Sequence, residues 1–376
     1  MSETWTTPDS SSTFDIELLK REVGQRFPFY DMKTDGNTAV FFCRVDELLL
    51  EEKFEQLRVS LAEKGYIPMI RFEGGEHLIY IIKKPPIRKK PVWINLALLI
   101  ATVFTTTLAG SLQWVSILEP TLNDFIAILS KSFSPEYLSN GFLFFSIPLL
   151  LILGCHEMGH YLISKKHNVE SSLPYFIPLP PPFILGTFGA VISTREPIPN
   201  RKALLDIGIA GPLAGFLVAI PVCFVGFFLM QQNPISIPQS ENIGYMSPPL
   251  IIQWIQTFFS LPDNILIHPT LFAGWVGIFL TAVNLLPVGQ LDGGHVARAF
   301  LKEKHRYASW AVVIILLILG LLYTGWLMFA LIVFLLIGTH HQPPLNEHDA
   351  LDTRRKLLGV LIIIVFILSF APIPFS

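Results

Sequence analysis

The chain has 376 residues, of which 51% are hydrophobic and only 15% are charged, whereas a soluble domain carries about 25% charged residues. The mean hydropathy of +0.52 excludes an ordinary soluble protein, and the near-balanced formal charge of -2 gives no reason to expect nucleic-acid binding. The three cysteines, Cys43, Cys155 and Cys223, are too few and too widely spaced for a disulfide scaffold or a Cys-x-x-Cys module.

The N-terminal segment has no features of a targeting peptide. Residues 1–15 are rich in Ser and Thr, contain three acidic residues and lack an apolar core, and the first basic residue is Lys20. Secretory signals need an apolar core, and organelle transit peptides are rich in Arg and poor in acidic residues. We therefore expect neither kind of leader in this sequence.

Residues 1–85 are expected to form a small α+β cytoplasmic domain. The pattern predicts five elements in chain order: helix 14–23, strand 37–45, helix 46–64, strand 66–72 and strand 76–82. Asp46 is the expected cap of the second helix. This segment has no catalytic motif, so we expect it to bind a regulatory partner. The basic, Pro-rich residues 86–91 form a stiff linker to the membrane.

Seven apolar segments follow, and we expect six or seven of them to cross a membrane, because a helical span needs about 20 mostly apolar residues. They are 92–117, 142–164, 203–229, 269–288, 309–323, 326–338 and 357–373. The fifth and sixth are short and form either two short spans or one kinked hairpin. The sequence thus predicts a polytopic α-helical membrane protein with a soluble N-terminal domain.

The basic residues predict the orientation of the chain. When the chain is threaded alternately through the apolar segments, every cluster of Lys and Arg falls on one side. The opposite loops contain only Lys131, and the long loop 231–267 contains no basic residue. The positive-inside rule makes the basic side cytoplasmic and places the N-terminus there.

The second apolar segment contains the sequence His156-Glu157-Met158-Gly159-His160. Helical spacing puts the two histidines on one face, where their imidazoles can bind one zinc ion, and Glu157 beside them can act as a general base. The alternative is a pair of surface histidines. The apolar surroundings disfavour it, because ionisable groups are costly inside a membrane.

A catalytic zinc ion needs a third protein ligand and an open position. His167 lies close behind the motif, but in a polar turn, and is expected to be a solvated loop residue. Asp292 is the better candidate, since it is the only acidic residue between Asp263 and Glu303 and a carboxylate beside an apolar segment needs a cation. It belongs to the sequence NLLPVGQLDGG, which begins at Asn284. An interfacial turn or helix cap is the alternative for this segment.

These motifs resemble those of the site-2 protease family of intramembrane zinc metalloproteases, peptidase family M50. The resemblance rests on HExxH in one apolar segment, on NxxPxxxxDGG in a later one and on the segment from Pro174 to Gly215. It covers residues 92–300, the expected metalloprotease core. Residues 301–376 are then expected to add C-terminal transmembrane helices.

The resemblance implies an activity and a set of site residues. The activity is zinc-dependent cleavage of peptide bonds within or near transmembrane helices of substrate proteins, in the lipid bilayer. The implied zinc ligands are His156, His160 and Asp292, with Glu157 as the catalytic acid and base. Asn284 would hold the substrate backbone or the oxyanion.

The arrangement of the chain is most similar to the EGY-type branch of this family. The loop 231–267 has no inserted PDZ domain, and no pair of nucleotide-sensing repeats follows at the C-terminus. The soluble N-terminal domain and the sequence His340-His341-Gln-Pro-Pro are similar to that branch. Without a transit peptide, a prokaryotic cell membrane is the expected location, and a chloroplast membrane is the alternative.

A β-rich segment at residues 183–194 is too short to span the membrane. We expect a re-entrant hairpin or sheet edge that lines the active site and binds an unwound substrate through Thr187 and Gly189, although a plain interfacial loop is the alternative. Gly211 and Gly215 are interpreted as helix-packing residues. Asp206 is expected to pair with Arg201 or Lys202, close by in the sequence.

Two other classes of protein are compatible with buried ionisable residues. A transporter or channel would show internal repeats and a chain of carboxylates, and the sequence has neither. A metal-binding scaffold without activity is disfavoured because Glu157 is present beside the predicted ligands.

Overall fold

The computed structural model describes residues 14–35, 38–85, 91–236, 246–262 and 264–374. The chain divides into two compact units. The N-terminal unit comprises Met1–Arg88 and Pro344–Asp349, and the membrane unit comprises Lys89–Pro343 and Ala350–Ser376.

The N-terminal unit is a four-stranded antiparallel sheet with two helices, which confirms its predicted mixed α and β character. Its elements are α1 (Ile16–Gly24), β1 (Phe29–Asp35), β2 (Thr38–Cys43), α2 (Leu50–Glu63), β3 (Tyr66–Glu73) and β4 (Glu76–Lys83). The strand order is β1-β2-β4-β3. Buried side chains of β2 alternate with half-buried ones, and its Phe41 joins Leu19 of α1 and Phe54 of α2 in one core.

Two features of this unit differ from the sequence prediction. Strand β1 was not predicted, because Asp31, Lys33 and Asp35 make it polar and most of its residues are exposed at the sheet edge. Helix α2 begins at Leu50 and not at residue 46. The Asp46 side chain instead accepts a hydrogen bond from the amide of Leu48 (3.0 Å), which closes a turn before the helix.

A short segment from the C-terminal part of the chain completes the N-terminal unit. The amide of Ile70 on β3 donates to the carbonyl of Leu345 (3.0 Å), and the Arg71 guanidinium donates to the carbonyls of Pro344 (3.0 Å) and Leu345 (3.3 Å). The Leu345 side chain is buried in the same core. The predicted domain boundaries did not include this segment, because its partners lie more than 270 positions away in the sequence.

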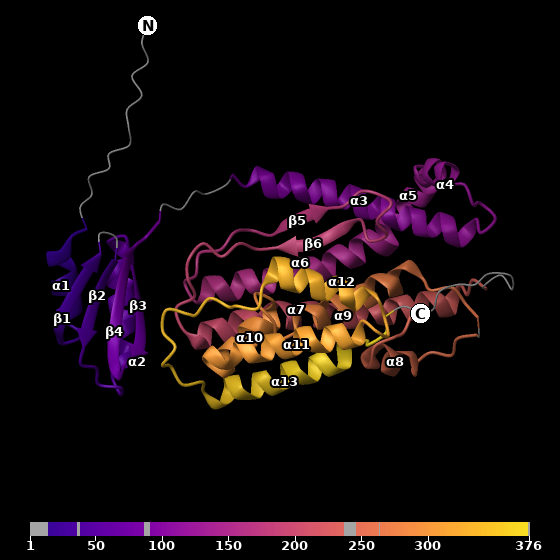
Figure 1. Ribbon diagram of the computed structural model, residues 1–376. Helices are drawn as coiled ribbons and strands as arrows, with labels where there is room; N and C mark the ends of the chain where they lie inside the picture. The colour runs from indigo at the N-terminus through magenta and orange to yellow at the C-terminus, as the bar shows by residue number, and fades with distance from the viewer. Residues whose placement is uncertain (1–13, 36–37, 86–90, 237–245, 263, 375–376) are drawn as a thin grey trace, which may run out of the picture. The chain divides into compact units, whose positions relative to one another are not determined.

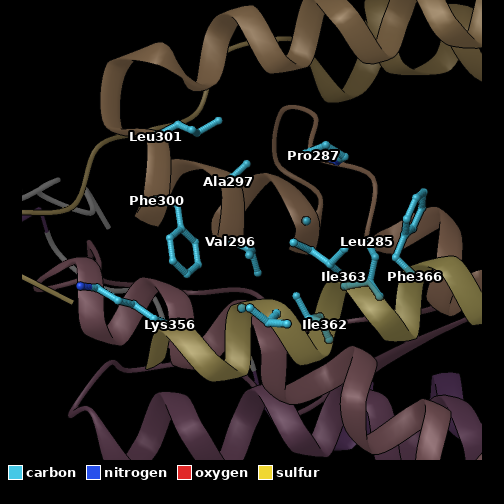
Figure 2. A pocket seen from close by; sticks show the side chains of 13 residues that line it. Leu285, Pro287, Val296, Ala297, Phe300, Leu301, Lys356, Ile362, Ile363 and Phe366 are labelled. Atoms are coloured by element: carbon cyan, nitrogen blue, oxygen red, sulfur yellow. The ribbon is translucent and has the colours of Figure 1, made fainter. Parts of the chain in front are cut away.

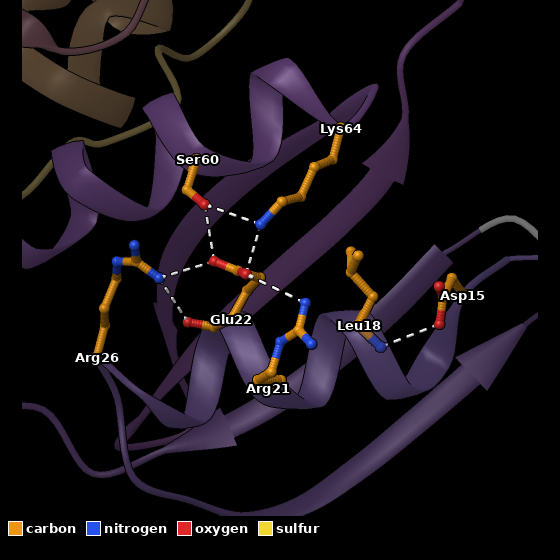
Figure 3. A network of polar contacts seen from close by, with 7 residues as sticks. All are labelled: Asp15, Leu18, Arg21, Glu22, Arg26, Ser60 and Lys64. Carbon is orange, nitrogen blue, oxygen red and sulfur yellow. Dashed lines mark hydrogen bonds and ion pairs between the residues drawn. The ribbon is translucent and has the colours of Figure 1, made fainter.

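Glu22 is the centre of an ion network in the N-terminal unit (Figure 3). Its buried carboxylate accepts hydrogen bonds from Lys64 (2.5 Å), Ser60 (2.7 Å) and Arg26 (3.0 Å). The hydrogen bond from Lys64 is the largest of the effects that lower the pKa of Glu22 to about 2. The folded unit therefore stabilises the ionised form of Glu22 relative to the unfolded chain.

We expect this network to make the N-terminal unit sensitive to acid. Folding lowers the pKa of Glu22. The network therefore stabilises the fold fully above about pH 4.5, and this stabilisation is lost as the pH falls toward 2. Glu22→Gln should destabilise the unit by about 1–3 kcal/mol at pH 7 and weaken its acid dependence. Hydrogen exchange of the α1 and α2 amides in the full chain measures both effects. The control Glu17→Gln removes an exposed carboxylate that pairs with Lys20, and an equal effect of both substitutions would refute the expectation.

The membrane unit is helical. Its main helices are α3 (Trp93–Leu118), α6 (Ile147–Lys166), α7 (Arg201–Gln232), α9 (Pro269–Asn284), α10 (Asp292–Leu301), α11 (His305–Leu319), α12 (Gly325–Ile332) and α13 (Thr353–Ser369). Short helices α4 (Phe125–Ser132), α5 (Pro135–Gly141) and α8 (Leu250–Gln256) connect them. So do the π-helices η1 (Phe142–Ser146) and η3 (Val333–Ile337) and the 3₁₀-helix η2 (Lys302–Lys304). Helix α5, π-helix η1 and helix α6 form one continuous helical segment, Pro135–Lys166.

Three helical segments in the described part of the chain are long and apolar enough to cross a membrane: Trp93–Leu118, Pro135–Lys166 and Arg201–Gln232. These correspond to the first three predicted spans and support a membrane protein. Pro269–Asn284 and Gly325–Leu335 are apolar but shorter. The count of six or seven spans therefore stays a prediction.

A two-stranded sheet lies beside α3 and α6 (Figure 1). Strand β5 (Tyr175–Pro178) pairs with strand β6 (Thr187–Val191) in antiparallel register. The segment 183–194 thus supplies only one of the two strands. The prediction that this segment forms a complete hairpin by itself is therefore wrong. The partner strand was missed because it has only four residues, 175–178, and ends at a Pro, a residue type depleted in strands.

Candidate active site

Helix α6 carries His156, Glu157 and His160 on consecutive turns of one buried stretch. All three side chains are buried, with at most 8% of each residue exposed. Asp292 reaches the same place from the first residue of α10, where its side chain is 17% exposed. The two histidines and the aspartate form the single group in the described ranges that could hold a metal ion.

The distances among these three residues fit a tetrahedral zinc ion. The Nε2 atoms of His156 and His160 lie 3.2 Å apart. Nε2 of His156 lies 3.3 Å from Oδ2 of Asp292, and Nε2 of His160 lies 3.3 Å from Oδ1 of the same carboxylate. Ligands held about 2.0–2.1 Å from zinc at tetrahedral angles are separated from one another by about 3.3 Å. The two imidazoles and the carboxylate, whose ligand atoms all lie within 4.8 Å of one another, are therefore close enough to bind one zinc ion.

Contacts around the histidines set their orientation. His160 donates a hydrogen bond from Nδ1 to the carbonyl of Ile207 (2.8 Å), which leaves the lone pair of Nε2 for a metal. The side-chain nitrogen of Asn284, the last residue of α9, lies 3.5 Å from Nε2 of His156. Asn284 thus lies beside the metal-binding group, and its predicted role toward the substrate stays a prediction.

The two glycines of the GxxxG motif provide space for the imidazoles. A Cβ atom on Gly211 would lie 2.0 Å from Nε2 of His160, and one on Gly215 would lie 3.2 Å from Nδ1 of His156. Helix α7 can therefore pack against α6 only if these positions lack side chains. The sequence predicted a packing role, but it did not predict that the packed groups are the metal-binding histidines.

We expect Gly211→Ala to weaken zinc binding by about 10-fold or more, because the added methyl group displaces the His160 ring from its place beside Asp292. The control is Gly154→Ala on α6, where the nearest atom is 3.9 Å from the added Cβ. Zinc content after dialysis against a competing chelator measures the effect. Equal retention of zinc by both variants would contradict this interpretation.

Glycines also shape the segment that presents Asp292. A Cβ on Gly293 would lie 2.0 Å from the carbonyl oxygen of Leu285, and one on Gly294 would lie 2.3 Å from that of Gly289. The start of α10 therefore touches the backbone of the preceding loop directly. This contact brings Asp292 and Asn284 to one site although they belong to different helices.

Glu157 is held next to strand β6. Helix α6, which carries Glu157, contacts strand β6 directly. The Thr187 hydroxyl donates to the carbonyl of Ile177 (2.9 Å) and accepts from the amide of Gly189 (3.0 Å), whose φ is +99°. Thr187 and Gly189 thus shape the beginning of β6 and line an apolar cavity of about 330 Å³.

Two other residues differ from the sequence interpretation. His167 is not a solvated loop residue, because its Nε2 lies 2.9 Å from a carboxylate oxygen of Asp206. Asp206 also accepts hydrogen bonds from Arg355 on α13 (2.6 and 2.9 Å). This ion pair ties α7 to α13, and its two residues are 149 positions apart, so the sequence pattern gives no signal for it.

The fold and the site together define a membrane-embedded metal centre of the metalloprotease type, and comparisons with known proteins agree. The family model "Peptidase family M50" matches residues 144–323. A rice protein named "Probable zinc metalloprotease EGY1, chloroplastic" is 30% identical over 75% of this chain and 50% of its own length. The Arabidopsis protein of the same name is 30% identical over 97% of this chain and 72% of its own length. No solved structure matches the chain.

The chain therefore belongs to peptidase family M50, and its similarity to the EGY proteins confirms the predicted branch. Zinc, as named in these relatives, is the metal that the two histidines and the aspartate fit. The chain spans half of the rice relative and 41% of the Arabidopsis protein named "Probable zinc metalloprotease EGY2, chloroplastic", to which it is 25% identical.

Proposed function

We propose that this chain is an intramembrane zinc metalloendopeptidase that cleaves peptide bonds within or near transmembrane helices of membrane-protein substrates. One observation carries the proposal: three side chains suited to zinc, His156, His160 and Asp292, have ligand atoms within 4.8 Å of one another, and Glu157 lies beside them on an apolar helix. The family and the names of the relatives support zinc-dependent proteolysis.

His156, His160 and Asp292 would hold the zinc ion. A zinc ion bound there would supply Lewis-acid chemistry, lowering the pKa of a water molecule and polarising the substrate carbonyl. A pair of histidines with one carboxylate suits zinc better than calcium or magnesium, which prefer oxygen ligands. The choice of side chains thus supports zinc as the cofactor.

Glu157 moves the proton in the reaction. Its carboxylate accepts a proton from the attacking water and then donates it to the leaving amine. Asn284, beside His156, donates a hydrogen bond to the oxygen of the cleaved carbonyl as negative charge develops there.

The substrate must be extended at the cleaved bond, because a regular helix uses its own carbonyls in hydrogen bonds. Strand β6 has one paired neighbour, β5, in the described part of the chain. We propose that a substrate segment unwound at Gly, Pro or Asn pairs with the second edge of β6, near Thr187 and Gly189.

Cross-linking tests this substrate path. Phe188, between Thr187 and Gly189, is exposed, and Phe188→Cys should form a disulfide with cysteines placed near the scissile bond of a substrate. The control is Leu217→Cys, at an exposed position on α7, which should not form this disulfide. If neither cysteine forms the disulfide, or the control forms it equally well, β6 is not the substrate-binding edge.

Removal of the metal tests the activity. In liposomes with tagged transmembrane substrates, a zinc chelator should abolish cleavage, and zinc but not calcium should restore it. Cleavage that is insensitive to chelation would contradict the proposed function.

The membrane location follows from the apolar helices, and the relatives named chloroplastic favour the chloroplast alternative over a prokaryotic cell membrane. In a cell membrane the positive-inside rule puts the N-terminal unit on the cytoplasmic side. Cleavage then releases a fragment to that side, and the N-terminal unit is available to a regulatory partner.

A further inference from the structure

An open apolar groove runs between α10 and α13 of the membrane unit (Figure 2). Its volume is about 370 Å³. Of the 13 residues that line it, Lys356 is the only one with a charged side chain, and the others are apolar or glycine. A groove of this composition binds a molecule that is almost entirely hydrocarbon.

The groove has a charged end and an apolar end. Lys356 lies at one end and Phe366 at the other, and both belong to α13, as does Ile363 between them (Figure 2). Ten residues of helix span about 15 Å. This length equals one leaflet of a bilayer whose hydrocarbon core is about 30 Å thick.

The charge of Lys356 is available to a ligand. Its neighbour Arg355 is bound to Asp206 and Asp352. Lys356 is exposed in the first turn of α13, and no carboxylate of the residues that the structure describes pairs with it. A cation at the end of a hydrocarbon-lined groove, at the depth of the bilayer surface, complements an anionic head group attached to an acyl chain.

We propose that this groove binds one acyl chain of an anionic phospholipid, with the phosphate at Lys356 and the chain directed toward Phe366. The basic side chain at one end of the apolar lining favours a phospholipid over a transmembrane helix, because it complements an anionic head group.

The bound chain would contact the segments that carry site residues. Leu285 and Gly293 line the groove and directly follow Asn284 and Asp292. The lipid would thus support the loop that presents the metal ligand. The lipid site itself requires only that the chain is embedded in a membrane, so its test is independent of peptidase activity.

Photolabelling of the full chain in nanodiscs tests the proposal. The probes are phosphatidylglycerol and phosphatidylcholine, each with a photoreactive diazirine in one acyl chain, and labelled residues are mapped by mass spectrometry. In the wild type, phosphatidylglycerol should label α10 and α13 about fivefold more than phosphatidylcholine, the preference expected from one basic side chain at a membrane surface. Equal labelling by the two lipids would overturn the proposal.

Three variants separate the two parts of the site. Lys356→Gln should lower phosphatidylglycerol labelling to the level of phosphatidylcholine. Ile363→Trp fills the groove from an exposed position and should abolish labelling by both lipids, whereas Leu357→Trp, exposed on α13 outside the groove, should leave it unchanged. Unchanged labelling in Lys356→Gln, or labelling of the groove by a photoreactive transmembrane peptide in place of lipid, would overturn the proposal.

Discussion

Glu157→Gln should lower the rate of peptide cleavage by about 10²–10⁴-fold while the protein keeps its zinc, because the amide cannot accept the proton of the attacking water. Glu157 is not one of the three grouped metal-binding side chains, and glutamine has nearly the same size as glutamate. The substitution therefore removes the proton transfer and leaves the metal-binding group in place. Initial rates on a tagged transmembrane substrate, with zinc content measured on the same samples, give both quantities.

A conservative variant separates chemistry from packing at this position. Glu157→Asp retains a carboxylate with a shorter reach and should recover part of the rate lost in Glu157→Gln. Glu136→Gln, an exposed acidic position on α5, should retain the wild-type rate. If Glu157→Gln cleaves as fast as the wild type, Glu157 is not the general base.

Asp292→Ala should lose zinc and activity together. The substitution leaves only the two histidines, and loss of one of three protein ligands should weaken zinc binding by on the order of 100-fold or more. Metal content after dialysis and cleavage rate should therefore fall in parallel, unlike the separate effects expected for Glu157→Gln.

The next acidic residue along the chain provides the matched control. Glu303 lies exposed in the 3₁₀-helix η2, and Glu303→Ala should retain full zinc content and activity. Asp292→Ala protein that binds a full equivalent of zinc would show that the third ligand lies elsewhere.

The metal-binding group was predictable because its chemistry is encoded locally. His156 and His160 share a face by helical spacing alone, and Asp292 stands out as an isolated carboxylate next to a glycine pair. The resemblance to family M50 then implied that the two motifs contribute ligands to one zinc site. The structure brings the three side chains together at zinc-ligand spacing.

The supporting contacts were not predictable, because they join residues far apart in the sequence. His160 is oriented by the carbonyl of Ile207, 47 positions away, and its ring is accommodated by Gly211 of the same helix α7. No local pattern identifies such partners.

The same reasoning explains the misses in the fold. Strand β1 is a polar edge strand without the alternation that predicts a strand, so its sequence reads as a loop. Segment Pro344–Asp349 contributes to the N-terminal unit through the carbonyls of Pro344 and Leu345 and one buried leucine side chain. Main-chain contacts of this kind do not depend on side-chain identity, so the sequence pattern does not predict them.

The position of the cleaved bond tests the central claim most directly. Mass spectrometry of the products from a transmembrane substrate, incubated with wild-type protein in liposomes, identifies that bond. We expect it inside the apolar segment, near a helix-destabilising Gly, Pro or Asn, with products absent for Glu157→Gln and after zinc removal. Cleavage confined to soluble loops, or at the same bond in the Glu157→Gln variant, would contradict an intramembrane zinc peptidase.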